Sequence, residues 1–170
     1  MEREDRTAGQ DCYPEDAARC FGCGRLNDAG HRLRTFWDGE GTVARFTPDA
    51  SHTALPGYVY GGLLASLVDC HGTGSAAAFA GRTAGRKLGE EEVPPGEVPR
   101  FVTARLEVDY RRPTPLGPEL VLRGRLEERT ERKVVVGVTV EARGEVTVEG
   151  RVVAVPMPEG MAGGRAGVPE

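Results

Sequence analysis

Residues 58–72 read YVYGGLLASLVDCHG, and this stretch decides the fold. Its apolar side chains recur at the spacing of one helical face: Leu63, Leu64, Leu67 and Val68. This spacing, followed by a run of alanines, predicts a helix from Gly61 to about Phe79. Gly72 and Gly74 each disfavour a helix by about 1 kcal/mol relative to alanine, so the pattern predicts a kink or an early end in the second half.

Strand patterns flank this helix on both sides. Six segments have the alternation of strands: residues 32–37, 42–46, 102–110, 120–126, 134–140 and 146–154. Short turns at 38–41, 129–132 and 143–144 favour antiparallel pairing of neighbouring segments. One long helix with five to six antiparallel strands predicts an α+β fold, in which the sheet buries its apolar face on the helix.

The segment 102–110 alternates clearly enough to divide its residues between two faces. The apolar face consists of Val102, Ala104, Leu106, Val108 and Tyr110. Thr103 falls in the other set, with charged neighbours, so the alternation predicts that it lies on the polar face of the strand.

The chain organises as one domain, which we expect to span residues 12–158. Residues 1–11 and 159–170 lack a core pattern, and we expect both ends to be flexible. Residues 81–99 are rich in proline and glutamate and are predicted to form a solvated loop insertion. A mobile lid over a binding site is the alternative for this loop.

Composition excludes several classes of function. A net charge of −4 and an isoelectric point near 5.5 give no general attraction for nucleic acid or an anionic membrane. The longest apolar stretch is interrupted by Asp69 and His71, so no membrane span is expected. The sequence shows no secretory signal, and its four cysteines are typical of reduced thiols, which together indicate a cytoplasmic protein.

Two features of the predicted helix indicate chemistry. Paired glycines, Gly61 and Gly62, let another molecule approach the backbone where the first amides of the helix have no internal partner. Such amides lie at the positive end of the helix dipole and suit a developing oxyanion. Asp69 is a carboxylate within an apolar helix, which is costly to bury unless it is paired or has a chemical task.

These residues resemble a known family. The run Tyr60-Gly61-Gly62-x-x-x-x-Leu67-Val68-Asp69 is similar to the His-Gly-Gly-x-x-x-x-Leu-x-Asp helix of hotdog-fold acyl-CoA thioesterases of the phenylacetate-pathway type. Residues 20–30, with CFGCG at their start, resemble the N-terminal Cys-x-x-Cys-Gly-x-x-Asn element of bacterial members. Residues 102–113 resemble the strand after the helix. The likeness covers residues 20–156 and implies a hotdog fold.

The resemblance also implies roles for individual residues. Asp69 matches the carboxylate that attacks the thioester carbonyl or activates water. Gly61, with Gly62 beside it, matches the amide that binds the thioester oxygen. Thr103 matches a residue that helps hold the catalytic water. The implied substrate is an acyl-CoA, the implied assembly is a homodimer or a dimer of dimers, and no cofactor is implied.

Two positions depart from the family pattern. The usual histidine is Tyr60, which we expect to contact substrate, and an asparagine that some members carry corresponds to Ala54. Tyrosine cannot act as a base near neutral pH, so a polar helper is expected from His52, Thr53 or Tyr58. These departures also favour an alternative, a non-catalytic acyl-CoA-binding protein. A hydratase is disfavoured because its Asp-x-x-x-x-His pair is absent.

Other polar residues have competing interpretations. Two basic pairs flank predicted strand ends: Arg111 with Arg112, and residues 132–133. They either bind the CoA phosphates or are solvated residues at the ends of strands. His71 is predicted to be a packed or subunit-contact histidine, because residues two apart do not share a helix face with Asp69. Cys70, adjacent to it, is not expected to be a nucleophile.

One set of residues could be considered as zinc ligands: Cys12, Cys20, Cys23 and His31. Cys-x-x-Cys is a common half-site, but the spacing to the histidine is longer than usual for a second half-site. We therefore expect no metal, and small buried thiols in this segment.

The spacing of the two catalytic candidates carries a further expectation. Gly61 and Asp69 are eight residues apart, about 12 Å along one helix axis, whereas reacting groups must meet at about 3 Å. An antiparallel helix from a second subunit closes this gap, and two-fold symmetry then creates two shared active sites.

Overall fold

A computed structural model of the chain describes residues 6–161 and consists of a six-stranded sheet packed on one long helix, α1 (Gly61–Thr83). The strands are β1 (Thr35–Asp38), β2 (Gly41–Phe46), β3 (Phe101–Tyr110), β4 (Leu120–Arg129), β5 (Val134–Ala142) and β6 (Glu145–Pro156). Short 3-10 helices are η2 (Gly9–Cys12), η3 (Glu15–Ala17), η4 (Ala50–His52), η5 (Pro95–Glu97) and η6 (Glu159–Met161). The predicted α+β layout is confirmed.

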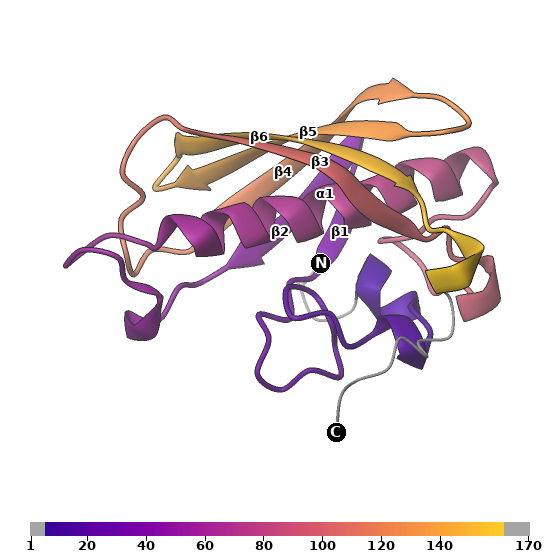
Figure 1. Ribbon diagram of the computed structural model, residues 1–170, viewed down its shortest axis with the longest axis horizontal. Helices are drawn as coiled ribbons and strands as arrows, with labels where there is room; N and C mark the ends of the chain where they lie inside the picture. Colours follow the sequence, from indigo (N-terminus) through magenta and orange to yellow (C-terminus); the bar gives the residue numbers. More distant parts are fainter. Residues whose placement is uncertain (1–5, 162–170) are drawn as a thin grey trace.

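The strand order in the sheet is β1-β2-β4-β5-β6-β3, and every neighbouring pair is antiparallel. β3 follows α1 in the chain and pairs with β6, so β1 and β3 form the two edges. Figure 1 shows α1 running along one face of the sheet. The sheet therefore buries its apolar face on the helix, as the alternation predicted.

Helix α1 and the sheet lie so close together at two positions that only glycine fits between them. A Cβ on Gly72 would lie 2.4 Å from Val152 Cγ2, and a Cβ on Gly150 would lie 2.3 Å from Val68 Cγ1. Gly72 therefore serves packing, and α1 continues through it to Thr83 rather than ending near Phe79. The expected early end of the helix is wrong, because tertiary contact outweighs the low helix propensity of glycine.

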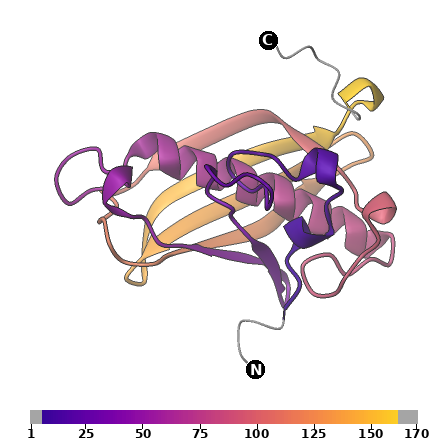
Figure 2. The same ribbon diagram turned by 90° about the horizontal axis from the view of Figure 1, so that it is seen from below.

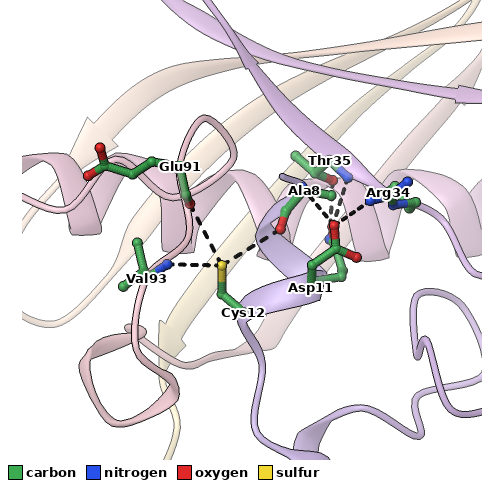
Figure 3. A network of polar contacts seen from close by, with 8 residues as sticks. Ala8, Asp11, Cys12, Arg34, Thr35, Glu91 and Val93 are labelled. Carbon is green, nitrogen blue, oxygen red and sulfur yellow. Dashed lines mark hydrogen bonds and ion pairs between the residues drawn. The ribbon is translucent and has the colours of Figure 1, made fainter. Parts of the chain in front are cut away.

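The N-terminal segment, residues 6–34, lies on the side of α1 that faces away from the sheet (Figures 1 and 2). Ala8 and Gln10 in this segment are fully buried, so the expected flexibility of residues 1–11 is wrong for this part. Residues 1–5 lie outside the described residues, as do residues 162–170 of the expected C-terminal tail. Figure 3 shows Asp11 accepting a hydrogen bond from the Ala8 N–H at 2.9 Å and pairing with Arg34.

A buried polar network joins this segment to the helix. Gln10 Nε2 donates to Thr35 Oγ1 at 3.3 Å, and Thr35 Oγ1 lies 3.1 Å from His71 Nδ1. On the other side of the ring, Thr42 Oγ1 lies 3.4 Å from His71 Nε2 and 2.6 Å from Ser75 Oγ. His71 is fully buried, and desolvation lowers its pKa to about 3. The prediction of a packed histidine is confirmed.

The segment predicted as a solvated loop, residues 81–99, is mostly exposed after the helix ends, but three of its apolar side chains are anchored in the core. Residues 81–83 complete the helix, and Leu88, Val93 and Val98 are buried against Cys12 and Ala77. Their spacing follows neither a helix nor a strand, which is why the sequence pattern did not reveal them. Within residues 6–161, no helix is both long enough and apolar enough to cross a membrane.

Candidate active site

Asp69 lies on the half-buried face of α1 and is paired with a residue of β3. Thr103 Oγ1 donates a hydrogen bond of 2.5 Å to Asp69 Oδ1. Both side chains line a cavity of about 470 Å³ between α1, β3 and the N-terminal segment. A cavity of this size is in the range that accommodates small-molecule ligands.

The position of Thr103 corrects the expectation that it lies on the polar face. The register between β3 and β6 shifts between Thr103 and Arg105, which leaves Ala104 as the extra residue of a β-bulge. Paired residues of antiparallel strands point to the same face, and Thr103 pairs with the buried Ala154. The bulge thus turns Thr103 toward the helix and Asp69, while Leu106 still pairs with the buried Val152.

The start of α1 has the features that an oxyanion site requires. Tyr60 is the N-cap, and the first helical hydrogen bonds run from Leu63 N (3.1 Å) and Leu64 N (3.3 Å) to its carbonyl. The amides of Gly61 and Gly62 precede these donors, so the helix does not use them. They therefore stay available at the positive end of the helix dipole.

Two tyrosines surround this helix start. Tyr110, at the end of β3, donates from its hydroxyl to Gly61 O at 2.7 Å. The ring of Tyr60 lies over Gly62, where a Cβ would come within 2.4 Å of it. Tyr60 and Tyr110 are nevertheless 57% and 53% exposed. Tyr110 was not among the predicted site residues, although its place at the end of the apolar face of the strand was a signal for it.

One chain does not bring Gly61 and Asp69 together. They are eight residues apart on a continuous helix, about 12 Å along its axis, and Gly61 does not line the cavity that contains Asp69. Within the described residues, the carboxylate and the helix-start amides therefore belong to separate places on the surface of a single subunit.

The predicted phosphate-binding arginines lie at the surface and are ion-paired. Arg111 contacts Glu149 at 2.6 Å, and Arg112 contacts Glu145 at 3.2 Å. Exposed pairs of this kind contribute about 0–1 kcal/mol, so they leave both arginines able to exchange partners.

The residues proposed as polar helpers are engaged close to their own backbone. His52 Nδ1 accepts from Asp49 N at 3.0 Å, and Thr53 Oγ1 donates to Leu55 O at 2.9 Å. Tyr58 is exposed. The structure brings none of these three into the cavity of Asp69.

The structure does not bring together the four candidate zinc ligands Cys12, Cys20, Cys23 and His31. Cys12 contacts Val93 N at 3.3 Å, and the ring of His31 packs on Phe21 and Phe46. Cys20 and Cys23 instead meet Cys70 of α1, a residue that sequence spacing did not connect with them.

The three thiols of Cys20, Cys23 and Cys70 influence one another strongly. Contact with Cys23 and Cys70 lowers the pKa of Cys20 below the usual value of a thiol. Contact with Cys20 raises the pKa of both Cys23 and Cys70. These thiols line the same cavity as Asp69.

The sequence and the fold of this chain are similar to those of known proteins. A family model described as the Thioesterase superfamily matches residues 56–149, which include α1, β3, β4 and β5. A Thioesterase superfamily protein from Shewanella loihica PV-4 is 49% identical, over 74% of this chain and 91% of that chain, with a TM-score of 0.60. No curated protein matches the sequence.

Two solved structures of lower identity share the fold. The PaaI protein of the phenylacetic acid degradation operon of Escherichia coli is 14% identical over 75% of this chain and 81% of that chain, with a TM-score of 0.59. A hypothetical thioesterase from Streptococcus pneumoniae, solved with coenzyme A, is 16% identical over 74% and 86%, with a TM-score of 0.56. Because the family match spans more than half of the chain and a sheet packed on one long helix accompanies it, this protein belongs to the Thioesterase superfamily and has the hotdog fold.

Proposed function

We propose that this protein hydrolyses an acyl-CoA thioester to a free acid and CoA, with Asp69 as nucleophile or general base. The observation that carries the proposal is the hydrogen bond between Thr103 and Asp69 in the wall of a cavity. Similar structures from Streptococcus pneumoniae and Streptococcus mutans were solved with coenzyme A and acetyl CoA, which supports a CoA ester as the ligand.

The proposed chemistry follows from the helix and its carboxylate. The thioester oxygen accepts a hydrogen bond from the Gly61 N–H, with Gly62 beside it, and the helix dipole stabilises the negative charge that develops there. Asp69 either attacks the carbonyl carbon or removes a proton from the attacking water. If Asp69 attacks, the C–S bond breaks, CoA leaves as a thiolate, and water then hydrolyses the acyl–Asp69 anhydride to the free acid. If water attacks, the C–S bond breaks in the same way, and the proton held by Asp69 passes to the leaving thiolate. Thiolate is a good leaving group, so this reaction requires no metal or redox cofactor.

Thr103 has a more specific role in this proposal than holding water. Its hydroxyl engages Oδ1 of Asp69, which fixes the orientation of the carboxylate and assigns the attack to Oδ2. Thr103 is thus a positioning residue that acts through Asp69. Tyr110 acts in a similar way at the other end, since its hydroxyl fixes the carbonyl of Gly61 and with it the start of α1.

We also propose that the active site is shared between two subunits of a homodimer. Two observations support this: the separation of about 12 Å between Gly61 and Asp69 along one helix, and the exposed edge of β3. Leu106, on the helix-facing side of that edge, is 38% exposed, and Tyr110 at its end is 53% exposed. A second subunit placed along β3 covers these side chains and brings its own helix start toward Asp69.

Subunit mixing tests the shared site. We expect Asp69→Asn and Gly61→Val to be inactive alone. Random exchange of the two chains gives half mixed dimers, each with one intact site, so activity should return to about a quarter of the wild-type value per chain. Circular dichroism checks that each variant folds, and native mass spectrometry confirms exchange. Zero activity after confirmed exchange, or an active monomer, excludes the shared site.

The phosphates of CoA would require cationic partners, and we propose Arg111 and Arg112 for this role. The test compares an acyl-CoA with the corresponding acyl-pantetheine, which lacks the nucleotide. Arg111→Gln should raise KM for acyl-CoA and leave KM for acyl-pantetheine unchanged. Arg123→Gln, at another ion-paired strand position, is the matched control. Equal KM values for Arg111→Gln and wild type with acyl-CoA would exclude the role.

The second candidate function is acyl-CoA binding without turnover. Tyr60 favours it, because this residue stands where the related thioesterases carry histidine and its ring lies over Gly62 beside the proposed oxyanion amides. A panel of acyl-CoA esters separates the two functions. Calorimetric binding without release of free thiol would support the binding protein, whereas thiol release would support the enzyme. The four free cysteines support a cytoplasmic location for either function.

A further inference from the structure

Three cysteines converge from two separate parts of the chain. Cys20 and Cys23 belong to the N-terminal segment, and Cys70 lies on α1, fifty residues from Cys20. Their sulfur atoms all lie within 4.8 Å of one another, and the Sγ atoms of Cys20 and Cys70 are 3.8 Å apart. All three are free thiols; Cys23 and Cys70 are buried, and Cys20 is exposed.

This spacing fits shared coordination better than a disulfide. Two sulfurs that each lie about 2.3 Å from one tetrahedral zinc ion are about 3.8 Å apart, the separation of Cys20 and Cys70. A disulfide requires about 2.05 Å between sulfurs, so this pair would have to approach by almost half of its present distance. The widest separation in the group, 4.8 Å at most, needs to shorten by only about 1 Å to fit the same tetrahedron.

Two glycines make the convergence sterically feasible. A Cβ on Gly22 would lie 2.2 Å from Cys70 Sγ, so only glycine lets the helix cysteine approach the Cys-x-x-Cys turn. A Cβ on Gly24 would lie 2.5 Å from Cys20 N. The turn itself is closed by a hydrogen bond of 2.8 Å from Gly24 N to Cys20 O. Glycine at positions 22 and 24 therefore allows the backbone conformation in which the three sulfur atoms lie close together.

We propose that Cys20, Cys23 and Cys70 bind a zinc ion through three thiolates. Cys-x-x-Cys is a common zinc half-site, and soft sulfur ligands select zinc over the hard divalent cations. Each thiol releases its proton to solvent when the metal binds. Within residues 6–161, no fourth cysteine, histidine or carboxylate joins the group, and the adjoining cavity gives a solvent molecule access to the fourth position.

The zinc ion would fasten the N-terminal segment to α1 at the residue next to Asp69. The Cys-x-x-Cys turn lies at the wall of the cavity that contains Asp69 and Thr103, so the site would fix the shape of the proposed substrate cavity. The sequence-based expectation of no metal considered Cys12 and His31 as the partners of Cys20 and Cys23. In the proposed site Cys70 is their partner instead. The chemistry proposed for Asp69 does not pass through the ion.

The test begins with protein purified under reducing conditions without added metal. Elemental analysis should give about one zinc per chain, and a chromophoric chelator should remove it. Cobalt(II) added to the stripped protein should give the charge-transfer absorption of cobalt–thiolate bonds. Cys20→Ser is the main variant, because Cys20 is exposed and its replacement leaves the core intact. Its zinc affinity should fall by more than about a hundredfold. Cys12→Ser, a buried cysteine outside the group, is the matched control and should retain zinc.

Several outcomes overturn the proposal. One is a wild-type protein that contains no zinc and takes up none after reduction. A second is a disulfide between Cys20 and Cys70 or Cys23, found by mass spectrometry of protein purified without oxygen. A third is full zinc content in Cys20→Ser with wild-type circular dichroism. Iron or copper at one equivalent in place of zinc would overturn the choice of metal.

Discussion

The stability of this protein should depend on pH in part through one fully buried histidine. His71 is fully buried between Thr35 and Thr42, and desolvation lowers its pKa from 6.5 to about 3. In the unfolded chain the imidazole takes up a proton as the pH falls through 6.5, whereas in the folded protein it remains neutral to about 3. The unfolded state therefore binds more protons in this window. The contribution of His71 is complete above the unfolded pKa and is lost as the pH falls toward the folded value.

The magnitude follows from the size of the shift. One pKa unit corresponds to about 1.4 kcal/mol, so lowering the pH from about 7 to about 4 should remove about 3 kcal/mol from the free energy of unfolding. Urea unfolding at a series of pH values, followed by the fluorescence of Trp37 at fixed protein concentration, measures this slope. His71→Gln should lack this part of the slope, whereas His52→Gln, which replaces a half-buried histidine of η4, should keep it.

Parallel pH profiles for wild type and His71→Gln would refute this reasoning. A direct measurement guards against a variant that fails to fold: the imidazole resonances of His71 in the wild-type protein. They should not titrate between about pH 8 and about pH 5. A midpoint near 6.5 would show that the ring is accessible to solvent and is not desolvated as the structure indicates.

Two further predictions concern the hydrogen bond at the site and the packing of the helix. Thr103→Val should lower kcat by roughly tenfold to a hundredfold, with KM and the melting temperature little changed, because Asp69 loses its orienting hydroxyl; Thr103→Ser should restore most of the rate. A wild-type kcat for Thr103→Val would remove Thr103 from the mechanism. Gly72→Ala should destabilise the fold by about 1–3 kcal/mol, because its Cβ would lie 2.4 Å from Val152 Cγ2. The control, Gly160→Ala, should have the melting temperature of the wild type, because no atom lies within 4 Å of the added Cβ. Equal melting temperatures for these two variants would contradict the close approach of helix and sheet.

The elements that sequence predicted are those with a regular period. Leu63, Leu64, Leu67 and Val68 mark one helical face, and the alternating valines of β5 and β6 mark strands, so helix and sheet could be derived from side-chain spacing alone. The end of the helix was placed short at Phe79 because glycine disfavours an isolated helix, whereas Gly72 here faces a valine of β6.

The parts that sequence missed depend on irregular backbone or on distant contacts. Alternation assumes an unbroken strand and therefore assigned Thr103 to the polar face. Because of the bulge at Ala104, the strand residues that precede it point to the opposite face from the one that alternation predicts. Cys70 meets Cys20 across fifty residues, a contact that no local spacing encodes. Gln10 was expected in a flexible end, but it is buried because its amide completes the hydrogen bonds of the strand residue Thr35.

The roles of Asp69 and Gly61 stay predictions, because they concern a reaction rather than a position. The structure gives Asp69 a partner and a cavity, and it gives the Gly61 amide no role within the helix. The separation between them along α1 is what links the proposed chemistry to the proposed dimer.

The central claim is that Asp69 catalyses thioester hydrolysis, and the release of free thiol from an acyl-CoA tests it most directly. The measurement compares wild type, Asp69→Asn and Asp38→Asn at saturating substrate; Asp38 is an exposed carboxylate of β1 that pairs with Arg123. We predict turnover by wild type and Asp38→Asn, and a loss of about a hundredfold or more in Asp69→Asn with an unchanged circular dichroism spectrum. Hydrolysis by Asp69→Asn at the wild-type rate would contradict the account and make this carboxylate a structural partner of Thr103.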